Sequence, residues 1–146
     1  MASAIPNNAK LRIMNGGVDL DTDDIRVALL MTNTTADTEV DAMTFVNQYG
    51  TLDECDATGY ARVALASEAA TADDANDRAE FDATDSSFTG LSGDATRATQ
   101  GALIYKHVTN DTDSIPICFI DFSADIPTTA TQIDVPWNAE GILQLA

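Results

Sequence analysis

Two neighbouring segments near the end of the chain constrain its fold most. The segment 115–122, IPICFIDF, is apolar on both of its alternating faces, as expected of a strand inside a sheet. In the segment 100–108, QGALIYKHV, successive residues alternate between two faces, and Leu103, Tyr105 and His107 share one of them. The residues between the two segments, TNDTDS, are polar and few enough for a hairpin loop. The sequence therefore predicts two adjacent strands in the core of a β-sheet.

Shorter segments with strand character are spread over the rest of the chain. In the segment 25–31, Ile25, Val27 and Leu29 alternate with other residues, a pattern typical of a strand with one buried face. Weaker candidates lie at 61–67, 77–83, 86–91, 132–137 and 141–145. Polar turns separate these segments at nearly regular spacing. We therefore expect a single all-β domain over residues 1–146, folded as an antiparallel β-sandwich or small barrel.

The N-terminal region has a different pattern. Residues 7–15, NNAKLRIMN, are typical of a short helix, which Asn7 or Asn8 would cap and the pair Gly16-Gly17 would end. The domain is therefore expected to begin with a short helix.

Residues 1–9 are expected to form an N-terminal arm. This segment is polar enough to be unstructured alone, yet Ile5 and Pro6 form an apolar, extended element that can add to the edge of a neighbouring sheet. Ile5 and Pro6 are therefore the predicted partner-binding residues. Because the strands that supply the core begin only after Gly17, removal of residues 1–8 is expected to leave the domain folded.

The predicted core consists of alternating residues in the best strands. Its members are Ile25, Val27, Leu29, Leu103, Tyr105, Ile117, Phe119, Ile133 and Val135. Cys118 is expected to be a small buried hydrophobe, and a disulfide between Cys118 and Cys55 stays open because the sequence does not supply its geometry. Trp137 ends an alternating segment and is also expected in the core.

The charge balance disfavours several classes of partner. The chain has 24 Asp and Glu residues against 7 Lys and Arg residues, a net charge of −17 over 146 residues. Such a surface repels phosphate backbones and anionic lipids, so we expect neither direct nucleic-acid binding nor adhesion to a membrane. No apolar run has the length of a signal peptide or of a membrane span.

A run of aspartates precedes the strand at 25–31. Asp19, Asp21 and Asp23 occupy the first, third and fifth positions of an EF-hand loop, but the sixth position is Asp24 and the twelfth is Leu30. An EF-hand requires glycine and a bidentate glutamate at those two positions, so this loop is not one. A looser calcium or magnesium site on the three aspartates is a weaker candidate. The favoured interpretation is an acidic turn that is not required to bind metal for folding.

Candidates for catalysis are few. His107 is the only histidine, and the favoured interpretation places it at the face or rim of a sheet. The segment 73–85 surrounds Arg78 with five aspartates, and paired carboxylates can perform acid–base chemistry on a sugar. A solvated acidic turn, with Arg78 paired to a neighbouring carboxylate, is favoured instead. We therefore predict no enzyme activity, no catalytic residue and no cofactor.

Several motifs are informative through their order. They are NGG at 15–17, DLDTDDIRVALL at 19–30, TGYARVAL at 58–65, DDANDRAEFDA at 73–83, GALIYKHV at 101–108, IPICFIDF at 115–122 and VPWNAEGILQL at 135–145. This order resembles a family of small structural proteins of tailed viruses, which are often encoded among head and tail genes. The resemblance extends from about Leu11 to Leu145, and it is weakest at Cys118 and over the long acidic segment 33–57.

The resemblance implies a β-rich virion component without an enzymatic role. The leading expectation is a capsid decoration, or cement, protein on the capsid exterior, made in the host cytoplasm. Its expected partners are the major capsid protein and copies of itself, by default in a homotrimer. Two alternatives stay open. One is a tail tube, terminator or fibre-associated protein. The other is a carbohydrate- or calcium-binding adhesion module that would use the aspartate clusters, Trp137 and the tyrosines.

Salt should stabilise the fold by screening its acidic surface. Like charges repel one another across a folded domain, and the Debye length falls to about 3 Å in 1 M salt, so the free energy of unfolding should rise with added NaCl. Urea unfolding at low salt and in about 1 M NaCl measures this change. The absence of a rise would contradict the hypothesis that the composition suits a marine or halophilic environment.

Overall fold

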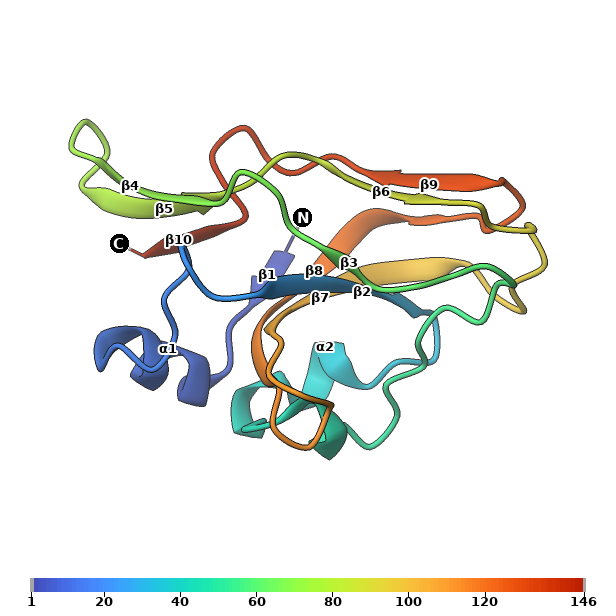
Figure 1. Cartoon of the computed structure of the whole chain (residues 1–146), viewed down its shortest axis with the longest axis horizontal. Coiled ribbons are helices and arrows are strands. Elements are labelled where there is room, and N and C mark those ends of the chain that lie inside the picture. The colour runs from blue at the N-terminus through green and yellow to red at the C-terminus, as the bar shows by residue number, and fades with distance from the viewer. Residues whose placement is uncertain (1, 146) are drawn as a thin grey trace.

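The computed structural model describes residues 2–145, and a five-stranded antiparallel sheet lies at its centre (Figure 1). In spatial order the strands are β1 (Ala2–Ala4), β8 (Ile115–Ile126), β7 (Thr99–Lys106), β2 (Ile25–Met31) and β3 (Val63–Ala64). The predicted hairpin is confirmed, because β7 and β8 pair antiparallel in the middle of the sheet, with Leu103 opposite Phe119. β1 and the very short β3 form the two edges.

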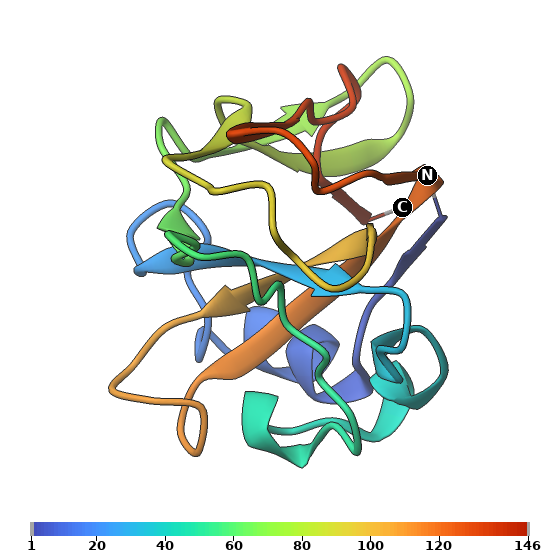
Figure 2. The same cartoon turned by 90° about the vertical axis from the view of Figure 1, so that its right-hand side faces the viewer.

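Two small antiparallel sheets cover one face of the central sheet (Figures 1 and 2). The first contains β10 (Leu143–Leu145), β5 (Arg78–Asp82) and β4 (Ala69–Asp73), and the second contains β6 (Ser86–Thr89) and β9 (Gln132–Val135). The pairs β4–β5 and β6–β9 bring the acidic segment and the last alternating segment into the same layer. The central sheet and this upper layer together give the predicted antiparallel, sandwich-like arrangement.

Helical segments lie on the opposite side of the central sheet (Figure 1). They are α1 (Asn7–Met14), α2 (Ala36–Glu39) and the 3₁₀ turns η1 (Val40–Ala42) and η2 (Val46–Gln48). The short N-terminal helix is confirmed, and it ends just before Gly16, whose positive φ of 74° suits glycine. The predicted asparagine cap is wrong, because Pro6 occupies the N-cap position and no side chain caps the helix.

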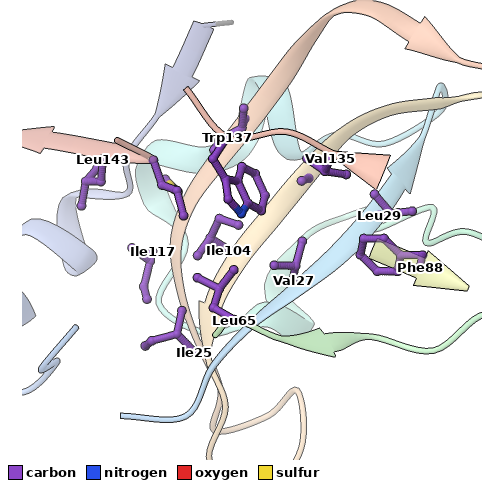
Figure 3. Close-up of a cluster of buried hydrophobic side chains, with 14 of the residues drawn as sticks. Ile25, Val27, Leu29, Leu65, Phe88, Ile104, Ile117, Val135, Trp137 and Leu143 are labelled. Carbon is purple, nitrogen blue, oxygen red and sulfur yellow. The ribbon is translucent and has the colours of Figure 1, made fainter. Parts of the chain in front are cut away.

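The hydrophobic core consists of two clusters, one on each face of the central sheet. The upper core lies below the small sheets and includes Ile25, Val27, Leu29, Ile104, Ile117, Phe81, Phe88, Ile133, Val135 and Leu143 (Figure 3). The lower core faces the helical side and includes Ala28, Leu30, Leu103, Tyr105, Phe119, Ala36, Val40, Val46 and Tyr49. All nine predicted core residues are buried, but they are divided between these two clusters.

Burial on both faces corrects the prediction for β2. The sequence pattern indicated one buried face, whereas every residue of β2 except the half-buried Arg26 is buried. Ala28 and Leu30 point into the lower core, which α2 and the 3₁₀ turns cover. In β2, one set of alternating residues therefore faces the upper layer and the other set, which is also apolar, faces the helical layer. The strand lies in the middle of a three-layer arrangement.

The N-terminal arm predicted over residues 1–9 is replaced by ordered structure. Strand β1 pairs with β8, so that Ala4 lies opposite Phe119, and α1 begins directly afterwards. Met1 lies outside the described residues. Removal of residues 1–8 would therefore delete an edge strand and the start of a helix, and the expectation that the truncated domain stays folded remains a prediction.

Both cysteines are free thiols in buried positions, so the disulfide that the sequence left open is absent. The prediction for Cys118 as a small buried hydrophobe is confirmed, because its side chain is fully buried in the upper core. Burial raises the pKa of the Cys118 thiol to about 12.

Phe119 occupies the lower core at a place that only glycine leaves open. A Cβ atom on Gly101 would lie 2.5 Å from the tip of the Phe119 ring and 2.5 Å from the carbonyl oxygen of Ile120. The missing side chain at position 101 therefore lets the aromatic ring pack directly over the neighbouring strand β7.

Replacement of Phe119 by alanine should destabilise the fold by about 3–5 kcal/mol, because it removes a buried ring and leaves a cavity. The matched control is Val108→Ala, since Val108 is 51% exposed and its truncation should change the free energy of unfolding by less than about 0.5 kcal/mol. Urea unfolding measures both values. A cost below about 1 kcal/mol for Phe119→Ala would show that the packing of β8 is misassigned.

Candidate functional site

The predicted metal-binding aspartates form a closed turn before β2. The carboxylate of Asp23 accepts the backbone N–H of Asp19 at 2.8 Å and forms an ion pair with Lys106 at 2.7 Å. The carboxylate of Asp19 accepts the backbone N–H of Asp21 at 3.1 Å. These carboxylates therefore already have partners within the chain. Among residues 2–145, no group of three or more His, Cys, Asp or Glu side chains is arranged to hold a metal ion.

Asp21 contacts a different part of the fold. Its carboxylate accepts the backbone N–H of Ala70 in β4 at 2.5 Å. Ala70 pairs with Phe81 on β5, and β4 is an edge strand whose first four residues are exposed. Asp21 therefore connects the turn before β2 to the edge of the upper layer. It also accepts a backbone N–H that a further strand at this edge would otherwise pair with.

The histidine lies just beyond the end of β7 and is half-buried. The Nδ1 atom of His107 is 3.5 Å from the hydroxyl oxygen of Ser114, and that hydroxyl also accepts the backbone N–H of Val108 at 3.3 Å. Ser114 is fully buried, so its hydroxyl cannot reach a substrate. This Ser–His contact therefore has the geometry of a strand end rather than that of an activated nucleophile.

Arg78 forms ion pairs with three carboxylates, as the sequence predicted for at least one. Its guanidinium is 3.1 Å from Asp73 and 2.6 Å from Glu80, and it also pairs with Glu140. Hydrogen bonds from Asn76 and then from Arg78 lower the pKa of Asp73 against the effect of burial. A carboxylate held ionised in this way is a poor general acid, so Asp73 does not suit that role in glycoside hydrolysis.

A second arginine network was not predicted from the sequence. Arg62, after the turn at Gly59, donates to Glu54 at 2.7 Å and to Asp111 at 2.5 Å, and its guanidinium lies 5.2 Å from the centre of the Tyr105 ring. Hydrogen bonds to Glu54 and then to Asp111 raise the pKa of Arg62. The network joins the loop before β3 to the β7–β8 hairpin, and its partners are too far apart in sequence for a local pattern to reveal them.

Ile5 and Pro6 lie between β1 and α1. Pro6 is buried, and Ile5 is half-buried against the upper core, so both side chains pack within their own chain. Their predicted role in partner binding stays a prediction. Trp137 is buried in the upper core, as expected, and it therefore offers no exposed ring face to a sugar (Figure 3).

The exposed apolar residues that remain near the N-terminus lie one element later, on α1. Leu11 is 57% exposed and Met14 is 85% exposed. Lys10 is exposed beside them, and residues three or four positions apart share one side of a helix. We refer to Lys10, Leu11 and Met14 as the α1 face. In Figure 1 the helix lies at the margin of the molecule, below the central sheet.

The α1 face also differs from the rest of the surface in charge. Residues 1–18 contain Lys10 and Arg12 but no Asp or Glu, so all 24 acidic residues lie after residue 18. The other five basic residues each form an ion pair, namely Arg26, Arg62, Arg78, Arg97 and Lys106. Within the described part of the chain, the two basic residues without an ion pair are therefore both on α1. In the sequence, the absence of Asp and Glu from residues 1–18 is the feature that could have indicated this face.

Comparison with protein-family models, with curated proteins and with solved structures found no significant match to this chain. Over residues 2–145, the structure contains no helix that is both long and apolar enough to cross a bilayer.

The turn before β2 should contribute to stability through Asp21 rather than through a bound metal. Asp21→Ala should lower the free energy of unfolding by about 1 kcal/mol, because the Ala70 N–H loses its acceptor. Asp74→Ala is the matched control, since Asp74 is exposed in the β4–β5 turn and its removal deletes the same charge. The chelator EDTA should leave the melting temperature of the wild-type protein unchanged. A fall of many degrees with EDTA would revive the metal site.

Proposed function

We propose that this chain is a structural protein of a tailed virus, and that it decorates the outside of the major capsid shell. In the sequence, the proposal is supported by the order of the motifs, which resembles that of small virion proteins. The structural observation that carries it is the α1 face, an exposed apolar and basic patch on a domain with a net charge of −17.

The physical argument concerns what such a domain can bind to. An acidic surface stays hydrated and repels other acidic surfaces, so contact over most of the domain brings carboxylates together at a cost in free energy. Contact through α1 avoids this cost, because Leu11 and Met14 can be buried while the exposed Lys10 beside them contributes positive charge. We infer that α1 lies against the capsid shell and that the acidic β-layers face the solvent.

The same charge distribution is compatible with a closed ring of copies. The α1 face of one copy is complementary in charge to the acidic body of the next copy. A contact of this kind joins two different patches, and repetition by a rotation that closes gives a cyclic oligomer such as a trimer. Because the shell and the next copy would use the same α1 face, one copy makes only one of these contacts at a time, and the capsid protein and further copies of the chain are both proposed partners.

A tail component would use the same exposed helix, and the number of copies per particle distinguishes the two locations. A capsid lattice requires hundreds of copies, whereas a tail tip requires far fewer. The adhesion-module alternative has less support, because Trp137 is buried and because the carboxylates of Asp19, Asp21 and Asp23 already accept hydrogen bonds from backbone N–H groups of this chain.

Charge reversal on the α1 face should abolish attachment without unfolding the domain. We expect the double variant Leu11→Glu/Met14→Glu to occupy undecorated heads at least about tenfold less than the wild type at equal concentration, because two apolar contacts are lost and two carboxylates are added. The control Val108→Glu places the same charge at another exposed apolar residue and should bind as the wild type does. Co-sedimentation with heads followed by gel densitometry measures occupancy.

Two results would contradict the proposal. Equal occupancy by the double variant, with an unchanged melting temperature, would remove α1 as the docking element. A reconstruction of the particle that places the chain on the tail alone would remove the decoration role.

A further inference from the structure

The C-terminal end of α1 places an exposed asparagine directly before a glycine (Figure 1). α1 ends at Met14, Asn15 is its C-cap residue, and Gly16 follows with a positive φ of 74°. Asn15 is the only asparagine of the chain that glycine follows. Glycine has no side chain to shield its backbone nitrogen, so this nitrogen is open to reaction with the neighbouring carboxamide.

The surroundings of Gly16 leave its peptide bond accessible. A Cβ atom placed on Gly16 would meet no atom of residues 2–145 within 4 Å apart from its neighbours in the chain. The Gly16 N–H donates to the Ile13 carbonyl at 3.3 Å, which is longer than a typical N–H···O bond. The Asn15 Oδ1 atom accepts the Gly17 N–H at 3.1 Å, so the carboxamide is folded back over the Gly16 peptide.

Asn110 provides a comparison within the same chain. It is also exposed, and its Oδ1 atom accepts the Thr112 N–H at 2.8 Å in a turn of the same type. The residue that follows it is Asp111, whose side chain forms an ion pair with Arg62. The turn geometry is therefore shared by the two asparagines, whereas the unshielded nitrogen belongs to Asn15 alone.

We propose that Asn15 is a site of spontaneous deamidation in the folded protein. The backbone nitrogen of Gly16 attacks the Cγ atom of Asn15 and loses its proton to the solvent. The bond from Cγ to the side-chain nitrogen breaks, and this nitrogen leaves as ammonia. Water then opens the cyclic succinimide at either of its two carbonyl carbons, which yields aspartate or isoaspartate at residue 15. The net reaction consumes water and releases ammonia, without an oxidant, a reductant or another protein.

Ring closure requires the last turn of α1 to open. Asn15 has a ψ of 8°, so its backbone must rotate before the Gly16 nitrogen reaches Cγ. This rotation breaks the hydrogen bond from the Gly17 N–H to the Arg12 carbonyl, which is 2.7 Å long. Helix ends fray at little cost in free energy, and two consecutive glycines add backbone freedom. The folded chain should therefore react more slowly than the unfolded chain, and at Asn15 before any other asparagine.

The product carries a new carboxylate at the end of α1. This end of a helix already has a partial negative charge, so the added charge destabilises the last turn. The carboxylate also lies next to Met14 in the α1 face and repels an acidic neighbour that docks there. The effect on docking rests on the proposed function. It means that copies which stay free for long attach less well than newly made copies.

Peptide mapping tests the reaction. Purified full-length protein is incubated at neutral and at alkaline pH in water enriched in heavy oxygen. Trypsin then releases residues 13–26 as one peptide, and fragmentation in the mass spectrometer assigns the converted residue. We expect conversion at Asn15 with uptake of heavy oxygen, and faster conversion at alkaline pH because the attacking nitrogen must lose its proton. Conversion at Asn110 should be at least about tenfold slower, because the Asp111 side chain shields the nitrogen and raises the barrier.

Three variants separate the reaction from its effect. Asn15→Gln lengthens the side chain by one methylene and should show no conversion at residue 15. Asn15→Asp reproduces one product and should occupy undecorated heads at least about threefold less than the wild type. The matched control Asn138→Asp adds the same charge at an exposed position and keeps the oxygen that accepts the Glu140 N–H, so it should bind as the wild type does.

Two results would overturn the assignment of the reaction to Asn15. One is conversion in urea-unfolded protein but none in folded protein, which would show that the end of α1 protects the site. The other is an equal rate at Asn15 and Asn110, which would show that the glycine does not direct the reaction.

The effect on docking fails separately from the reaction. Unchanged occupancy by Asn15→Asp, while wild-type Asn15 still converts, would overturn only the link between deamidation and docking. Unchanged occupancy by Leu11→Glu/Met14→Glu would instead overturn the proposed role of α1, and conversion at Asn15 would still be measured by mass.

Discussion

The pairing of β7 with β8 in a sheet that is buried on both faces determines the rest of the architecture. Leu103 and Phe119 belong to the lower core, whereas Ile104 and Ile117 belong to the upper core, so neither face of these strands can be left in water. A chain of this size must then build two covers from the remaining residues. The upper cover consists of two small sheets, and the lower cover consists of short helical segments that supply Ala36, Val40 and Val46 among others.

The covers are held in place by polar contacts between segments that are distant in sequence. Arg62 joins Glu54 to Asp111, and Asp21 joins the turn before β2 to β4. Two reciprocal contacts fasten the loops around residues 56 and 95, because Asp56 accepts the N–H and hydroxyl of Thr96 while Asp94 accepts those of Thr58. Hydrogen bonds from the threonines lower the pKa of both aspartates, so these carboxylates stay ionised at neutral pH. Some of the acidic residues therefore stabilise the fold through specific contacts, in addition to keeping the surface hydrated.

The strongest strands and the core could be predicted from the sequence, because burial imposes an alternation that a single segment already shows. The nine predicted core residues illustrate this, since each is buried. The division of the core into two clusters was hidden, because a period of two assigns faces but does not say whether the second face is covered. β1 and β4 were missed for a related reason. Their residues, ASA and AATAD, are small or polar, and these strands form by pairing with β8 and β5 rather than by burying side chains of their own.

The candidate binding surface on α1 follows from which charged residues are paired within the fold and which are not. Acidic residues that pair with arginines or with backbone N–H groups are bound within the fold, so a partner responds mainly to those that are not. α1 carries the two basic residues without an ion pair within residues 2–145. In Figure 1 α1 lies below the central sheet, on the side opposite to the two small sheets of the upper layer. The α1 face is therefore the place on the described surface where contact with an acidic or apolar neighbour meets the least repulsion.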